Sequence, residues 1–92
     1  MKVRWLAAAV DDLDHVHTFT SQEDPASAEG EVQRVLGAVG SLRTRAATGR
    51  PGRVAGTREL RAEPYIVVYR VKAGAVQVLR VLHAACNWPA SP

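Results

Sequence analysis

Residues 64–71, with the sequence PYIVVYRV, decide the fold. Nearly every residue from Tyr65 to Val71 is β-branched or aromatic, and such side chains favour strands. Apolar side chains occupy both sets of alternating positions, so both faces of this strand are apolar. A strand of that kind lies inside a sheet and is covered on at least one face. We therefore predict that residues 65–71 form the strand on which the rest of the chain packs.

The segments on either side of this strand are also predicted to be extended. Downstream, residues 72–74 form a hairpin turn, and the apolar run from Ala75 to His83 returns as a second strand. Upstream, residues 57–60 form a short strand, and residues 61–64 turn the chain into the main one. Residues 2–6 form an opening strand, and residues 87–92 an extended tail bounded by prolines.

Two amphipathic helices are predicted between the opening strand and the rest of the sheet. The first begins at Ala7 and ends at residues 20–22. The second has Asp24 as its N-cap and Pro25 at its first position, and Gly49 is interpreted as the residue that terminates it. Apolar residues recur at helical spacing in both, at Ala9, Leu13, Val16 and Phe19/Thr20, then at Val32, Val35, Leu36, Val39, Leu42 and Ala46.

Few residues join the two helices, so they should form an antiparallel hairpin, and the sheet is the surface that can bury both apolar stripes. The predicted order is β-α-α-β-β-β. This is an α+β fold, a helical hairpin packed on a small, mainly antiparallel sheet. Ninety-two residues correspond to one small domain spanning residues 1–92.

The composition points to a globular protein of a reducing compartment. Cys86 is the only cysteine, so no internal disulfide can form, which fits the cytoplasm. The apolar run from Trp5 to Val10 is stopped at once by acidic residues, far too early for a secretory signal. Nothing approaches the length that spans a membrane.

Charge is divided unevenly along the chain. Residues 1–31 carry two basic and seven acidic side chains, whereas residues 32–92 carry ten basic and two acidic ones, within a total net charge of +3. The second part could attract an anionic partner, or its arginines could form a solvated surface; the sequence favours neither strongly.

Histidines and the cysteine offer weak candidates for chemistry. His15 and His17 lie two residues apart, so they cannot share one face of a helix, and with Asp11 and Asp14 they are better explained as a solvated helix surface than as a metal site. Cys86 is interpreted as a packed thiol. His83, at the end of a strand, stays open as a functional side chain. We expect no metal and no cofactor.

Six arginines fall within nineteen positions, opposed only by Glu59: Arg43, Arg45, Arg50, Arg53, Arg58 and Arg61. Guanidinium groups match carboxylates and phosphates alike. The loop has no aromatic side chains on which bases could stack. A protein partner is therefore favoured, or transient contact with the backbone of a nucleic-acid duplex. No sequence-specific nucleic-acid binding is expected. The run from Gly49 to Arg53 also lacks the Lys-Ser/Thr pair of a nucleotide-binding loop.

With these residues in view, nearly the whole chain resembles the RelE/ParE superfamily of bacterial toxins, and ParE-type toxins in particular. Trp5 and the first helix, the Asp24-Pro25 pair, and Trp88-Pro89 all contribute to the likeness. The most specific blocks are GRPGRVAGTREL (residues 49–60), PYIVVYRV (residues 64–71) and VLRVLH (residues 78–83).

The resemblance implies a toxin of a type II toxin–antitoxin system, neutralised by a cognate antitoxin that wraps over the helical hairpin and sheet. ParE-type members are associated with poisoning DNA gyrase, and RelE-type members with cutting mRNA on the ribosome. We predict that the partner-binding residues are Arg43, Arg50, Arg53, Arg58, Arg61 and Trp88.

Departures from the ribonuclease pattern favour a toxin that acts by binding. Ile66 stands where the ribonuclease branch has an arginine, and the chain ends soon after His83 without the late tyrosine. If the chain were a ribonuclease, its catalytic groups would be His83, Arg58, Arg61 and Arg80. The chain also departs from ParE-type toxins in three smaller ways. Leu6 replaces the usual Ser or Thr cap, the turn at residues 61–63 is short, and Ala84 replaces a common glycine. An inactive relative is therefore kept as a third alternative.

Overall fold

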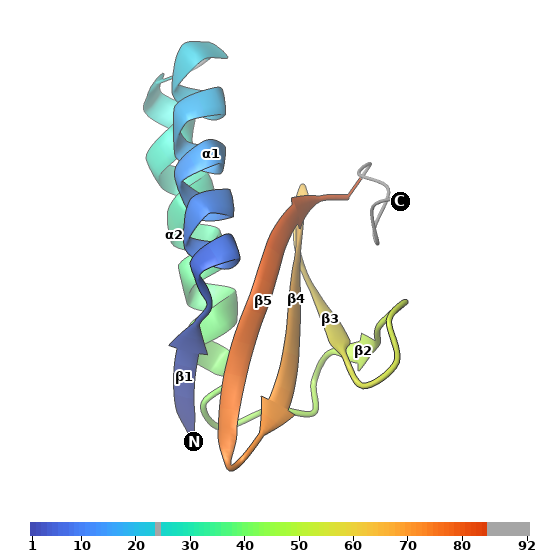
Figure 1. The fold of residues 1–92 in the computed structure, drawn as a ribbon. Helices are drawn as coiled ribbons and strands as arrows, with labels where there is room; N and C mark the ends of the chain where they lie inside the picture. The colour runs from blue at the N-terminus through green and yellow to red at the C-terminus, as the bar shows by residue number, and fades with distance from the viewer. Residues whose placement is uncertain (24, 85–92) are drawn as a thin grey trace.

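The computed structural model describes residues 1–23 and 25–84 and has the predicted order of elements with one short strand added. Figure 1 shows the arrangement. The elements are β1 (Lys2–Trp5), α1 (Ala7–Glu23), α2 (Pro25–Ser41), β2 (Arg50–Pro51), β3 (Arg58–Ala62), β4 (Tyr65–Lys72) and β5 (Ala75–His83).

β4 lies at the centre of a five-stranded sheet with the order β1-β5-β4-β3-β2. β1 pairs with β5 in parallel, and the other neighbours are antiparallel. The central position of residues 65–71 and the α+β architecture are therefore confirmed. β1 can be parallel to β5 because the helical hairpin and three strands lie between them in the chain, which is ample length for a crossover.

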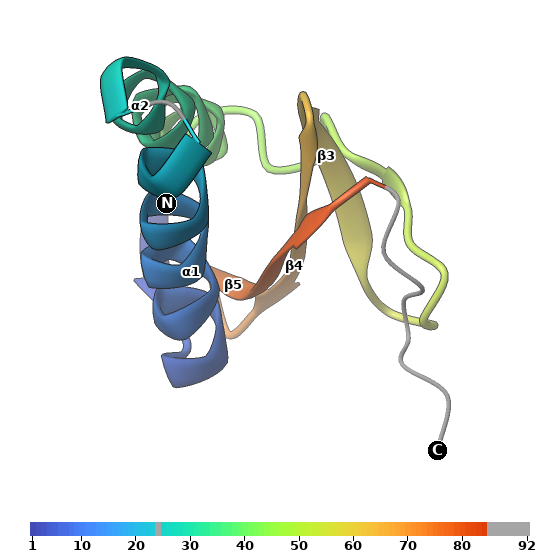
Figure 2. The ribbon, with the colours of Figure 1, turned by 90° about the horizontal axis from the view of Figure 1, so that it is seen from above.

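The helical hairpin covers one face of the sheet, as Figures 1 and 2 show from two directions. Tyr65 and Val67 of β4 belong to one buried cluster with Val16 of α1 and with Val35 and Val39 of α2. Val16, Val35 and Val39 are positions of the helical apolar stripes that periodicity indicated. Ile66 and Val68 alternate with the core residues, so they face the opposite side of the sheet, and both are buried as well.

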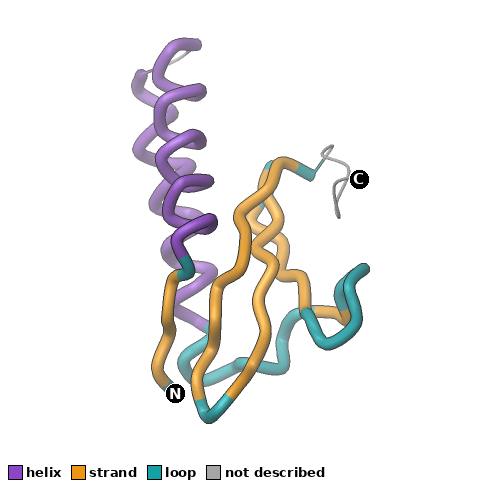
Figure 3. Tube along the Cα trace, in the orientation of Figure 1, coloured by secondary structure: helices purple, strands orange, loops and turns teal. Residues whose placement is uncertain are grey.

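A second buried cluster forms beside the loop that leaves α2. Figure 3 shows the path of this loop from α2 to β2. Leu42, Tyr69 and Val76 make up this cluster, and Ala46 packs against it. α2 was predicted to continue through these positions, but it ends at Ser41. Leu42 and Ala46 keep a helical spacing because both pack toward the core, Leu42 fully buried and Ala46 partly buried, although they lie in turns. The prediction of a longer helix was wrong for that reason.

Gly49 does not terminate a helix, as was predicted, because α2 ends eight positions earlier. Its backbone N–H donates to the Tyr69 hydroxyl at 2.9 Å, and the same hydroxyl donates to the Ala46 carbonyl at 2.6 Å. A Cβ added at Gly49 would lie 2.6 Å from that hydroxyl oxygen. The glycine is needed for close approach to the buried ring, not for a left-handed conformation.

Two boundaries near β3 also differ from prediction. The strand runs from Arg58 to Ala62, so the turn that follows is confined to Glu63 and Pro64. The expected loop contains β2, whose two residues Arg50 and Pro51 pair with β3. The predicted N-cap Asp24, the tail at 87–92, Cys86 and Trp88 lie outside the described residues. Within the described residues, no helix has the length and apolar character to span a membrane.

Candidate functional site

The face of the sheet that points away from the helices carries a buried acidic residue, Glu59 of β3. Glu59 pairs in register with Arg50 of β2 on one side and with Val68 of β4 on the other. It is only 3% exposed. An ionised carboxylate is costly to bury without partners, so the contacts of Glu59 identify the groups that this face brings together.

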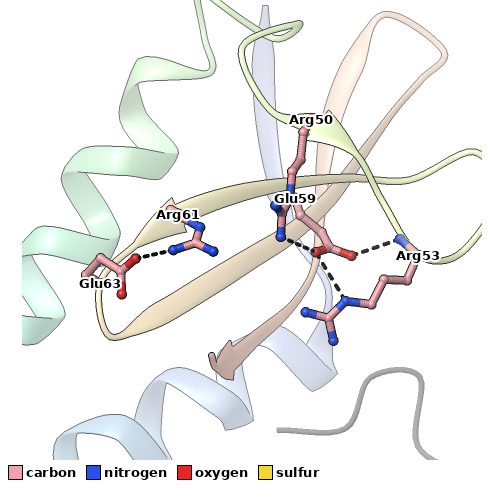
Figure 4. Close-up of polar contacts among 5 residues, drawn as sticks. All are labelled: Arg50, Arg53, Glu59, Arg61 and Glu63. Atoms are coloured by element: carbon pink, nitrogen blue, oxygen red, sulfur yellow. Dashed lines mark hydrogen bonds and ion pairs between the residues drawn. The ribbon is translucent and has the colours of Figure 1, made fainter. Parts of the chain in front are cut away.

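Both carboxylate oxygens of Glu59 are turned toward the loop that precedes β3 (Figure 4). One accepts the backbone N–H of Arg53 at 2.9 Å. The other lies 3.6 Å from Arg53 Nε and 3.8 Å from Arg50 Nη2. These two arginine side chains remain 41% and 56% exposed, respectively. Glu59 thus gathers two guanidinium groups at the surface while it is itself excluded from solvent.

Two short hydrogen bonds hold the loop that contains Arg53. Gly52 N–H donates to the Thr57 carbonyl at 2.8 Å, and the Thr57 hydroxyl donates to the Val54 carbonyl at 2.6 Å. Gly56 adopts a φ of 82°, which glycine tolerates without strain. This tight turn places the Arg53 N–H against Glu59.

The remaining predicted arginines separate into different surroundings. Arg61 lies on the same side of the sheet as Glu59 and pairs with Glu63 at 2.7 Å, with both side chains mostly exposed. Arg58 points to the helix side, where its guanidinium donates to the carbonyls of Gly49 at 2.7 Å and Ala47 at 3.3 Å. The run of arginines in the sequence is therefore not one patch.

Arg43 and Arg45 lie after the end of α2. Arg43 lines a pocket of about 330 Å³ together with Val3 and Trp5 of β1, at the opposite edge of the sheet from β2. Its carbonyl accepts a hydrogen bond from the N-terminal ammonium at 3.1 Å. Of the predicted partner-binding residues that the structure describes, only Arg50, Arg53 and Arg61 come together on one face.

The four residues proposed for ribonuclease chemistry are not brought to one point. His83 pairs with Tyr65 in register and contacts its ring edge-on, with ring centroids 5.7 Å apart, so it belongs to the helix side. Arg61 aligns with Ile66 and Leu82 and faces the other side. Arg58 shares the side of His83 but lies four residues further along β3 from the Ala62–Tyr65 pair, a displacement of roughly 13 Å.

Arg80 is committed to a structural contact with α1. Its Nε and Nη2 donate to the two carboxylate oxygens of Asp12 at 2.7 and 3.0 Å. Asp12 also accepts the backbone N–H of Val81 at 2.9 Å. β1 covers only the part of β5 up to Val78, so Asp12 satisfies a backbone donor on the uncovered part of the β5 edge.

A groove of about 370 Å³ lies between α1 and the end of β5. His15 of α1 and His83 both line it, over the apolar side chains of Val16, Tyr65 and Val81. No local pattern indicated that these two histidines line one groove, because 68 positions separate them. Among residues 1–23 and 25–84, no three histidine, cysteine or acidic side chains are grouped closely enough to hold a metal ion.

Glu59 is the residue that sequence analysis missed, since it was treated only as a charge opposing the arginines. The strand alternation could have found it. Leu60 and Ala62 face the helices, so Glu59 must face the other side, within a strand that is paired on both edges.

Comparisons with known proteins agree with this geometry. Residues 3–88 match the family model of the ParE toxin of the type II toxin–antitoxin system parDE. A Sinorhizobium fredii protein named "Putative toxin Y4kP" is 39% identical over 90 residues, which are 96% of this chain and 93% of that protein. The chain belongs to the ParE toxin family of type II toxin–antitoxin systems.

Two solved structures share the fold. A chain of the chromosomal ParDE toxin–antitoxin system from P. aeruginosa has a TM-score of 0.83 and 31% identity, over 90% of this chain and 95% of that one. A chain of the RelBE2 toxin–antitoxin complex from Mycobacterium tuberculosis has a TM-score of 0.59 and 28% identity, over 89% and 95% of the two chains.

Proposed function

We propose that this protein is a toxin neutralised by a cognate antitoxin in the cytoplasm, and that it acts by binding DNA gyrase, without cutting RNA. Membership of the ParE family supports the first part, together with the similarity to chains from the ParDE system and the RelBE2 complex. The resemblance to ParE-type toxins supports gyrase as the target.

The candidate ribonuclease residues lie on two different faces of the sheet, and this observation is the main support for a binding mechanism. Cleavage of RNA needs a base, an acid and a cation around one phosphate. His83 and Arg61 lie on opposite sides of the sheet, and Arg80 is held by Asp12. The position where the ribonuclease branch has an arginine is Ile66, which is 5% exposed.

The first test uses two assays on the purified chain in parallel. A gyrase supercoiling assay should show inhibition, with accumulation of cleaved DNA, and an mRNA cleavage assay on translating ribosomes should show no cleavage. Addition of the antitoxin should restore supercoiling. Ribosome-dependent mRNA cleavage without gyrase inhibition would overturn the proposal and favour the RelE-type alternative, and no effect in either assay would favour an inactive relative.

A second test uses the two histidines of the groove. His83→Ala should retain full gyrase inhibition, because this side chain contacts Tyr65 on the helix side and has no catalytic role in a binding mechanism. His15→Ala is the matched control, since it removes an imidazole from the same groove. Selective loss of toxicity in His83→Ala, with normal folding, would contradict the mechanism.

A further inference from the structure

We infer that the outer-face arginine cluster, defined as Arg50, Arg53 and Arg61 around buried Glu59, is a docking site for an acidic peptide segment of a protein partner. Carboxylates of the segment would accept hydrogen bonds from the guanidinium groups. The inference concerns a surface and its ligand chemistry, and it holds whether or not gyrase is the target.

The cluster is organised before any partner arrives. Glu59 is buried and contacts both Arg50 and Arg53, which are 56% and 41% exposed. Arg61 is 61% exposed and pairs with the equally exposed Glu63, so only Arg50 and Arg53 are positioned by a buried carboxylate. Arginine side chains lose much rotamer freedom when they bind a ligand, so guanidinium groups that are already held in place lose less. A solvated surface of unrelated arginines would need no buried carboxylate beneath it.

The spacing of the cluster fits an extended peptide. Glu59 and Arg61 lie two residues apart on one face of β3, so their Cα atoms are about 7 Å apart, and Glu59 contacts both Arg50 and Arg53. Acidic side chains at alternate positions of an extended peptide repeat at the same distance. A segment with the pattern acidic-x-acidic would therefore bring one carboxylate to Arg50 and Arg53 and the next to Arg61.

Side chains, and not strand addition, should carry the contact. The edge strand β2 is only two residues long, and Pro51 has no N–H to donate. A partner has little backbone to pair with at this edge, whereas the guanidinium groups are accessible to it.

The charge of the cluster favours a few carboxylates over a nucleic-acid backbone. Three arginines with Glu59 and Glu63 leave a net charge of +1, while nucleic-acid binding depends on neutralising many phosphates. On the described part of this face, no aromatic side chain lies among the cluster residues, and both tyrosines of β4 point to the helices. Stacking of bases is therefore not supported.

The experiment measures binding of the purified full chain to a fluorescein-labelled octapeptide of alternating glutamate and serine. Single-stranded RNA and DNA of equal charge serve as competing probes. We expect the peptide to bind more tightly than either oligonucleotide, with an affinity that falls as salt is raised. Tighter binding of RNA or DNA, or no binding of the peptide, would overturn the inference.

The main variant is Arg50→Gln/Arg53→Gln/Glu59→Gln, which removes the charges of these three side chains. The amide oxygen at position 59 can still accept the hydrogen bond from the backbone N–H of residue 53. Its peptide affinity should drop at least about tenfold, since each charge-assisted hydrogen bond contributes that much or more. Arg45→Gln is the matched control, because it changes net charge by the same amount at an exposed site outside the cluster. Equal affinities of these two variants would contradict the inference, and circular dichroism melts verify that both fold.

Glu59→Gln alone tests whether the buried carboxylate sets selectivity. It raises the net charge of the cluster from +1 to +2, so the ratio of peptide affinity to RNA affinity should fall by about threefold or more. An unchanged ratio would show that Glu59 serves only the fold. Neither gyrase nor antitoxin is present in these peptide-binding assays. A negative result in them would therefore overturn this inference without bearing on the proposed function.

Discussion

The two faces of the sheet each bury one polar side chain beside the same long loop, and they use it differently. On the helix side, Tyr69 is fully buried and bonds to the backbone of Ala46 and Gly49. On the outer side, Glu59 is nearly as buried but contacts arginine side chains that reach solvent. The first half of the loop is thereby tied into the core, and the second half is presented outward.

The comparison teaches that burial of a polar group can serve either the fold or a surface. The Gly49 N–H that bonds to Tyr69 is buried and the Ala46 carbonyl is partly buried, so removing the side chain leaves a cavity and unsatisfied groups. Exposed partners of Glu59 can be hydrated when the carboxylate is lost. Substitutions on the helix side should therefore affect stability, and substitutions on the outer side should affect binding.

The largest expected effect comes from removing the buried ring of Tyr69. Tyr69→Ala should lower the free energy of unfolding by about 3–5 kcal/mol, because it creates a cavity and leaves two backbone groups without a partner. Tyr69→Phe, which removes only the hydroxyl, should cost about 1–3 kcal/mol. Urea denaturation measures both. A loss below about 1 kcal/mol in the alanine variant would contradict the importance of this anchor.

The contact between Asp12 and β5 should come next in size. Asp12→Ala removes the bonds to Arg80 and to the Val81 N–H and should cost about 2–3 kcal/mol of unfolding free energy. Asp11→Ala, one position away on the exposed surface of α1, is the control and should cost less than about 0.5 kcal/mol. If the two variants had the same unfolding free energy, the contact of Asp12 with β5 would make no net contribution to stability.

Glycine substitutions sharpen the contrast between a close approach and an open site. Gly49→Ala should destabilise by about 2 kcal/mol, because the new methyl group would meet the buried Tyr69 ring. Gly40→Ala in α2 should stabilise by about 0.5–1 kcal/mol, since nothing lies within 4 Å of the added Cβ. Thermal melts of the two variants should move in opposite directions, and a shift of both in one direction would refute this account.

The smallest expected effect is at the exposed pair on the outer face. Arg61→Ala breaks the 2.7 Å contact with Glu63, yet it should change the unfolding free energy by less than about 0.5 kcal/mol because both side chains are well solvated. Chemical denaturation measures this. A loss above about 1 kcal/mol would place Arg61 with the structural arginines such as Arg58.

Much of the fold was predictable because burial imposes local periods. The apolar run at residues 65–71 indicated the central strand, and the stripes at Val16, Val35 and Val39 indicated the faces that meet the sheet. The same reasoning failed beyond Ser41. The packing of Leu42 and of the partly buried Ala46 continues a helical spacing without a helix, because periodicity reports packing toward the core and not hydrogen bonding.

The site was predictable only in part, because its arginines have the same local character. Arg50, Arg53, Arg58 and Arg61 all stand in or beside one polar loop, and the predicted strand ended at residue 60, so alternation gave no face to Arg61. Strand register separates them, since it turns Arg58 to the helix side and Arg61 to the outer side.

The sequence by itself determined the order of the helices and of every strand except β2, the central strand and the resemblance to ParE toxins. Short-range periodicity and a few contiguous motifs are enough for these. Only the tertiary structure decided that Asp12 meets Arg80 across 68 positions, that Gly49 faces Tyr69, and that Glu59 gathers Arg50 and Arg53. Each of these contacts depends on how separate segments pack and pair, and no local pattern of residues encodes that geometry.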